Sequence, residues 1–178
     1  NNQMNQMNSL TSANITYDFV DRQFVVNRDV IKEWLVQDSE GNYTLDETKA
    51  ASWVRQMAYE TDTFGLAHTF KTSLGPTIEL KGGGDYGWVI NKDKTTAALV
   101  EAVKAGTQGT MEPVYLYSAN DRSSNDIGDT YVEICISQQK MWCYKDGQLV
   151  VETPVVTGSH ATGYDTPAGS VWAIDAKK

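Results

Sequence analysis

Hydrophobic and polar residues alternate most regularly between Asp129 and Gly169. Short runs rich in β-branched and aromatic residues are separated there by turn-forming residues, a pattern typical of consecutive β-hairpins. A two-residue turn at Gln138 and Gln139 would pair Ile134 with Cys143 across the first hairpin. We therefore expect a strand on each side of these glutamines.

Period-two alternation gives this hairpin two different faces. The apolar face comprises Val132, Ile134, Ile136, Met141 and Cys143. The opposite face comprises Glu133, Cys135, Ser137, Lys140, Trp142 and Tyr144. We expect a third strand over Leu149–Val156 and the start of a fourth over Val171–Ile174. The apolar face needs a covering layer, which the first domain, a partner chain or a continuation of the polypeptide would supply. We favour a continuation.

Earlier in the chain, helical and strand patterns mix. Asn27 and Asn91 each precede apolar residues spaced three and four apart, as helix N-caps do. Thr44 and Glu47 have the spacing of a capping box, which predicts another helix start. Short alternating runs lie between these helices. Residues 13–118 are therefore predicted to form an α+β domain.

The predicted domain limits follow changes in composition. Residues 1–12 lack periodicity and are expected to be a flexible N-terminal segment. Residues 119–128 are polar and rich in turn formers, which is typical of a linker. Residues 129–178 then form the first strands of a mostly-β domain that is incomplete. The predicted fold class is an α+β N-terminal domain followed by the start of this mostly-β domain.

The stretch Gly82–Gly87 matches the pattern G-x-G-x-x-G. A dinucleotide-binding fingerprint requires a helix directly afterwards, because the helix N-terminus holds the pyrophosphate. Here a strand pattern follows, beginning at Trp88, and Lys81 is the one basic residue close by. We interpret the glycines as a flexible turn between two strands and exclude nucleotide binding.

The order of motifs in the last fifty residues resembles the opening of an L,D-transpeptidase catalytic domain of the YkuD type. The motifs are Ser-Gln-Gln-Lys (137–140), Tyr-Lys-Asp-Gly (144–147), Pro-Val-Val-Thr-Gly (154–158) and Thr-Pro-Ala-Gly (166–169). The preceding region, with Gly-Asp-Tyr-Gly-Trp-Val-Ile-Asn-Lys (84–92), a capped helix and Pro-Val-Tyr (113–115), resembles the peptidoglycan-binding domain found before such domains in Gram-positive enzymes.

This resemblance implies an enzyme that cross-links peptidoglycan stem peptides through a cysteine acyl-enzyme, with release of D-alanine. It also implies carbapenem β-lactams as inhibitors of the complete enzyme and no cofactor. The family places its nucleophile in a Ser-His-Gly-Cys motif downstream of Thr-Pro-x-Gly, and that motif does not occur before Lys178. We therefore expect no catalytic residue within the chain and no activity of the chain alone. The alternative is a non-catalytic cell-wall binding module.

Other candidate residues are few. Cys135 and Cys143 fall on opposite faces of the predicted hairpin, so we expect no disulfide between them. Neither cysteine follows a helix start or sits beside a glycine-rich turn, the settings that lower the pKa of a thiol, so we expect no catalysis from them. His160 and Tyr164 lie in a polar, glycine-flanked loop, where a substrate-binding flap at the rim of a cleft competes with a solvated loop carrying an incidental histidine. No two histidines have metal-ligand spacing, so no metal site is expected.

Composition limits the partners. With 178 residues and a net charge of −8, the chain is unsuited to nucleic acid or to an anionic membrane surface. No apolar run is long enough to span a bilayer. The resemblance implies a location outside the cell, in the wall or attached to the membrane. The chain begins with Asn1 rather than Met, so we expect any signal or anchor to lie outside this sequence. The oligomeric state is left open.

Overall fold

The protein consists of two compact units, each made from two separate stretches of sequence. The computed structural model describes residues 2–174. The first unit contains the chain up to Asp62 together with Val89–Tyr117. The second contains Thr63–Trp88 together with the chain from Ser118 onward.

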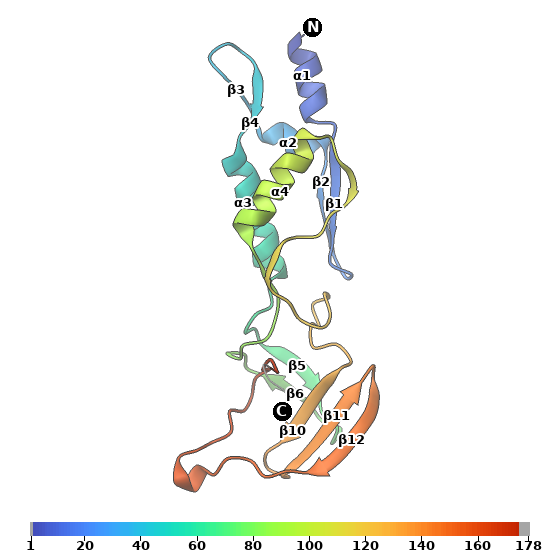
Figure 1. Cartoon of the computed structure of the whole chain (residues 1–178), viewed down its shortest axis with the longest axis vertical. Coiled ribbons are helices and arrows are strands. Elements are labelled where there is room, and N and C mark those ends of the chain that lie inside the picture. The colour runs from blue at the N-terminus through green and yellow to red at the C-terminus, as the bar shows by residue number, and fades with distance from the viewer. Residues whose placement is uncertain (1, 175–178) are drawn as a thin grey trace. The chain divides into compact units, whose positions relative to one another are not determined.

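The first unit is an α+β arrangement. Its elements are α1 (Asn2–Leu10), β1 (Asn14–Asp18), β2 (Gln23–Val26), α2 (Arg28–Glu33), β3 (Leu35–Gln37), β4 (Tyr43–Leu45), α3 (Glu47–Thr61), β7 (Val89–Ile90), α4 (Lys92–Lys104), β8 (Gln108–Thr110) and β9 (Tyr115–Tyr117). Its largest sheet has the order β2-β1-β8, with β2 antiparallel and β8 parallel to β1. Helices α3 and α4 lie side by side (Figure 1) and share one apolar core with β1.

Side-chain caps determine where the helices begin. The Asn27 side chain accepts hydrogen bonds from two backbone N–H groups at the start of α2, and Asn91 does the same for Lys94 N at the start of α4. Both predicted caps are confirmed. The third is wrong in its position: Asp46, which accepts from a backbone N–H two residues ahead, caps α3, while Thr44 pairs within the β3–β4 ladder.

Residues 2–10 form a helix where the sequence predicted a flexible segment over 1–12. None of the residues of α1 is buried, so the helix is not held by a core. Its polar side chains bond to the rest of the unit instead. Gln3 Nε2 donates to the Gly41 carbonyl at 3.0 Å, and Asn8 accepts from Arg28 Nη2 at 2.7 Å. Glutamine and asparagine are weak periodic signals, which is why the pattern did not reveal the helix.

The second unit is built mainly of strands. Its elements are β5 (His68–Lys71), β6 (Thr77–Leu80), β10 (Tyr131–Cys135), β11 (Lys140–Lys145), β12 (Gln148–Pro154) and the short 3-10 helix η1 (His160–Thr162). Strands β5 and β6 form a hairpin, and β10, β11 and β12 form an antiparallel sheet in chain order (Figure 1). The predicted fold class is confirmed.

The β10–β11 register is shifted by two residues from the prediction, because the turn has four residues. Ile134 faces Met141 rather than Cys143. Gln139 has a φ of 48° and donates its backbone N–H to the Ile136 carbonyl, which closes the turn. Its side-chain oxygen also accepts from the backbone N–H of Thr157 at 3.0 Å. A shift by two residues leaves every side chain on its predicted face.

The buried face of this sheet is the mixed one. Trp142 is 4% exposed, whereas Ile134 on the apolar face is 49% exposed. The mixed face packs against the β5–β6 hairpin, and the apolar face is open to solvent within the described part of the chain.

The predicted fourth strand is wrong. Val171–Ile174 has no strand structure, and the Ala173 backbone N–H donates instead to Asp85 Oδ1 at 2.8 Å.

The compact units differ from the predicted domain limits. Thr63–Trp88, which the sequence pattern placed with residues 13–118, belongs to the second unit. Residues 119–128, predicted as a linker, pack within that unit through the buried residues Asp126 and Ile127. No helix between residues 2 and 174 has the length and apolar character needed to cross a membrane.

The core of the first unit predicts a contrast between two residues of α3. Met57 is fully buried and Tyr59 is 84% exposed. Met57→Ala should lower the free energy of unfolding by about 2–5 kcal/mol, because it leaves a cavity. Tyr59→Ala, the matched control, should change it by about 0.5 kcal/mol at most. Urea unfolding of both variants measures this, and equal losses would contradict the assignment of the core.

Candidate functional site

Polar side chains fasten the tip of the β5–β6 hairpin to the sheet. Glu133 on β10 accepts from Ser73 N at 3.0 and 3.1 Å and from Ser73 Oγ at 2.5 Å. Ser73 Oγ also lies 2.7 Å from the Tyr144 hydroxyl. Because the serine hydrogen is given to the carboxylate, the tyrosine is the donor in this second bond. Bonds to an ionised carboxylate are the stronger kind. We call Ser73, Glu133 and Tyr144 the Glu133 clamp.

Aromatic rings extend the contact beside the clamp. Phe70 meets Tyr131 edge to face with ring centroids 5.3 Å apart, and Tyr131 lies 5.1 Å from Tyr144. Burial raises the pKa of the Tyr131 phenol above its ordinary value, and the neighbouring Tyr144, Glu133 and Asp129 raise it further. The phenol therefore stays neutral at physiological pH. This side of the sheet is an ordered polar and aromatic layer rather than an apolar one.

A buried histidine–aspartate pair holds the base of the hairpin. His68 Nε2 lies 2.6 Å from Asp126 Oδ1, and both side chains are almost completely buried. The Tyr86 hydroxyl donates to the Asp126 backbone carbonyl and accepts from Asn120 N, both at 2.8 Å. Removing one partner of such a pair leaves a polar group buried without compensation, which is costly. The pair therefore joins residues 63–88 firmly to the loop that precedes β10.

The predicted substrate-binding residues share one exposed loop. His160 opens η1, and its Nδ1 lies 3.0 Å from Asp165 Oδ2, while 95% of its side chain is exposed. Tyr164 is 79% exposed. Gly158 N donates to Thr166 Oγ1 at 2.7 Å and closes the loop. Both side chains are accessible to a ligand, and their role in binding stays a prediction.

The two cysteines are free and half-buried. Cys135 pairs with Lys140 across the hairpin, and its sulfur lies 3.4 Å from Ser137 Oγ. Cys143 pairs with Val132 and Val151 on the apolar face. Both histidines of the chain are engaged by aspartates, so the described geometry gives neither thiol a histidine partner for activation.

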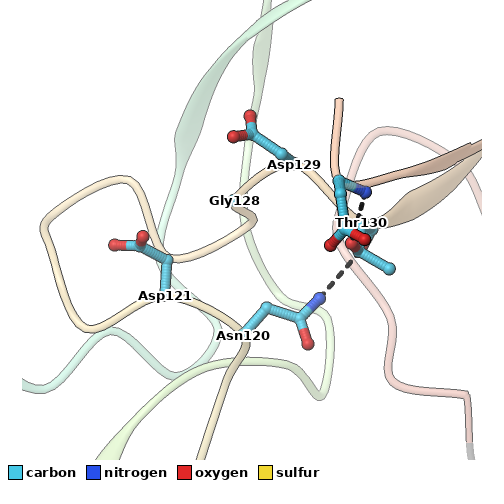
Figure 2. Close-up of a pocket in the computed structure, with 6 residues that line it drawn as sticks. Asn120, Asp121, Gly128, Asp129 and Thr130 are labelled. Atoms are coloured by element: carbon cyan, nitrogen blue, oxygen red, sulfur yellow. Dashed lines mark hydrogen bonds between the residues drawn. The ribbon is translucent and has the colours of Figure 1, made fainter. Parts of the chain in front are cut away.

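A hollow of about 410 Å³ lies where the loop before β10 meets the β11–β12 turn. It is lined by Asn120, Asp121, Gly128, Asp129, Thr130 and Asp146. Figure 2 shows the carboxylates of Asp121 and Asp129 apart from each other, while hydrogen bonds tie Asn120 and Asp146 to Thr130. Within residues 2–174, no three His, Cys, Asp or Glu side chains are grouped so that they could hold a metal ion.

Sequence reasoning missed the Glu133 clamp and the His68–Asp126 pair. Their partners are 58 to 71 residues apart in the chain, so no local spacing brings them together. The available signal was a glutamate and two tyrosines on the mixed face of a strand pattern. That signal indicates that the face is buried in a polar contact, but it does not show which segment of the chain makes the contact.

A family model described as "Putative peptidoglycan binding domain" matches residues 3–112. Two solved structures resemble the chain, each with 30% sequence identity and a TM-score of 0.73. One is a cysteine-to-serine mutant of Enterococcus faecium L,D-transpeptidase, with 95% of this chain and 66% of that chain covered. The other is the Ldtfm–avibactam carbamoyl enzyme, with 94% and 64% covered. The chain thus spans just under two thirds of each. No curated protein matches the chain.

The Glu133 clamp predicts a specific loss of stability. Glu133→Gln keeps the shape but removes the charge that accepts from two donors, the Ser73 N–H and the Ser73 hydroxyl, so the unfolding free energy should fall by about 1–2 kcal/mol. Glu79→Gln is the matched control, because Glu79 accepts one exposed bond from Thr69. Urea unfolding compares them. If the two variants lose the same unfolding free energy, within about 0.5 kcal/mol, the clamp does not contribute to stability.

Proposed function

The chain belongs to the putative peptidoglycan binding domain family and is similar in structure to L,D-transpeptidases, and from this premise we propose that it is part of an L,D-transpeptidase. It would contain the peptidoglycan-binding region and the first strands of the catalytic domain. The single observation that carries the proposal is structural similarity over 95% of the chain to 66% of an L,D-transpeptidase.

The proposed reaction is peptide exchange on peptidoglycan stem peptides. A cysteine thiolate attacks the carbonyl carbon of the peptide bond before the terminal D-alanine, so that a C–S bond forms as the C–N bond breaks. D-Alanine leaves with a proton supplied by a histidine. The amine of a neighbouring stem then attacks the thioester and gives its proton to the histidine, so that a C–N bond forms as the C–S bond breaks and the thiolate is released. Backbone N–H groups would stabilise the oxyanion in both steps.

We place the nucleophile in a segment that follows Lys178 in a longer polypeptide. Two observations support this. Neither Cys135 nor Cys143 has a histidine partner in the described geometry. The apolar face of the β10–β12 sheet, with Ile134 49% exposed and Val151 42% exposed, is the kind of surface that a further layer of the same domain covers.

The wall of a bacterium, outside the cell, is the proposed place of action. The peptidoglycan-binding family supports association with the cell wall. The similarity to a protein described as a carbamoyl enzyme with avibactam supports reaction of the complete enzyme with acylating inhibitors, for which carbapenem β-lactams are the proposed class.

A second candidate function is a cell-wall binding module without catalysis. The family match over residues 3–112 supports it, as does the lack of a cysteine–histidine pair within residues 2–174. The mass of the intact native polypeptide separates the two functions. Mass beyond Lys178 supports the enzyme, and a native chain that stops at Lys178 supports the module.

The 178-residue chain alone should bind but not react. It should sediment with purified peptidoglycan, because the family region is present. It should release no D-alanine from stem peptides and gain no mass from a carbapenem, since the proposed nucleophile lies elsewhere. Intact mass spectrometry after incubation checks the second point. A covalent adduct on Cys135 or Cys143 would overturn the assignment, and Cys135→Ser and Cys143→Ser variants would locate it.

We propose that His160 and Tyr164 form a flap at the rim of the substrate cleft. In the complete native polypeptide, His160→Ala and Tyr164→Ala should each raise the KM for stem peptides about three- to tenfold, as expected for the loss of one ligand contact. Thr162→Ala, in the same loop, is the control. Steady-state D-alanine release measures this. Unchanged KM values in both variants would mean a loop that only contacts solvent.

A further inference from the structure

The glycine-rich stretch beginning at Gly82 holds another part of the chain at backbone distance. A Cβ atom on Gly84 would overlap the Val171 carbonyl oxygen and would lie 2.7 Å from Ser170 Oγ. A residue with a side chain cannot let two backbones approach this closely, whereas glycine can. The glycine spacing that matches a nucleotide fingerprint therefore serves a contact with the chain's own backbone.

Hydrogen bonds flank this contact on both sides. Lys81 N donates to the Gly169 carbonyl at 2.8 Å, and Ala173 N donates to Asp85 Oδ1 at 2.8 Å. Residues 169–173 are thus held at both ends and in the middle, although they form no strand. We call residues 81–85 the glycine cradle.

The cradle is fixed relative to the β10–β12 sheet. It directly follows the β5–β6 hairpin, which the Glu133 clamp and the His68–Asp126 pair hold in place. Gly83 N donates to the Gly65 carbonyl at 2.9 Å, which ties the two ends of the segment 63–88 together. A segment held by the cradle is therefore held in the frame of the sheet.

We propose that the glycine cradle is a positioning element of the transpeptidase-like unit. It fixes the path of residues 169–173, which follow the Thr-Pro-Ala-Gly turn and lead toward the proposed nucleophile; this role rests on the proposed function. Gly84 provides the close approach, and Asp85 provides the final hydrogen bond. Residues 81–85, which the peptidoglycan-binding family model matches, thereby position a segment of the second unit, which contains β10–β12.

Hydrogen exchange on the 178-residue chain tests the contact itself. In Gly84→Ala and Asp85→Ala, the backbone N–H of Ala173, which donates to Asp85, should exchange about fivefold faster or more, the factor expected for one lost hydrogen bond. Asp85→Asn keeps an oxygen acceptor and should retain the protection. Lys81→Ala is the matched control, because the Lys81 side chain is exposed and the substitution keeps the backbone N–H that donates to Gly169. Unchanged exchange in Gly84→Ala and Asp85→Ala, or equal acceleration in the control, would overturn the cradle.

Acylation of the complete native polypeptide tests the positioning role. Asp85→Ala should lower the rate of acylation by a carbapenem about tenfold or more, because a small displacement of a reacting group is costly. Sedimentation with peptidoglycan should not change, a result that general unfolding would not give. If the unsubstituted polypeptide is not acylated, the proposed function fails while hydrogen exchange still decides on the cradle. Acylation of Asp85→Ala at the unsubstituted rate would overturn the positioning role.

Discussion

A small β-sheet has two faces, and the second unit is arranged around the need to cover them. The β10–β12 sheet buries its mixed face under a hairpin from much earlier in the chain, and the Glu133 clamp fastens that hairpin. A carboxylate in a half-buried contact is tolerated because it accepts from both the N–H and the hydroxyl of Ser73 there. The apolar face has no such cover among the described residues, which supports the proposal that a further layer of the domain covers it.

Local signals in the sequence determined much of the fold. Asn27 and Asn91 cap helices because their side chains bond to amides within the next turn, a relation that spacing alone reveals. The faces of the β10–β11 hairpin followed from alternation. The register did not, because the four-residue turn depends on the left-handed conformation of Gln139 and on its bond to Thr157. That bond joins the turn to a residue that follows β12.

The candidate site could be predicted only in part. The motif order indicated a transpeptidase-like region and an exposed loop with His160 and Tyr164, since order and spacing survive in the sequence. The pairing of His68 with Asp126 could not be predicted, because 58 residues separate them. The cover on the mixed face could not be predicted either, because the hairpin that supplies it lies about 60 residues earlier in the chain. Hydrophobicity predicts which face prefers burial, whereas the neighbouring hairpin, with its polar and aromatic contacts, decides which face is buried.

The interleaving of the two units has a consequence for synthesis on the ribosome. Residues 63–88 emerge well before the strands that they cover, and the first unit lacks Val89–Tyr117 until after this hairpin has appeared. Neither unit can therefore close from one contiguous stretch as the chain grows. The β5–β6 hairpin therefore stays exposed until the β10–β12 sheet has been synthesised, and nonlocal pairing of this kind is slow. During this window of translation the unpaired hairpin is open to premature association.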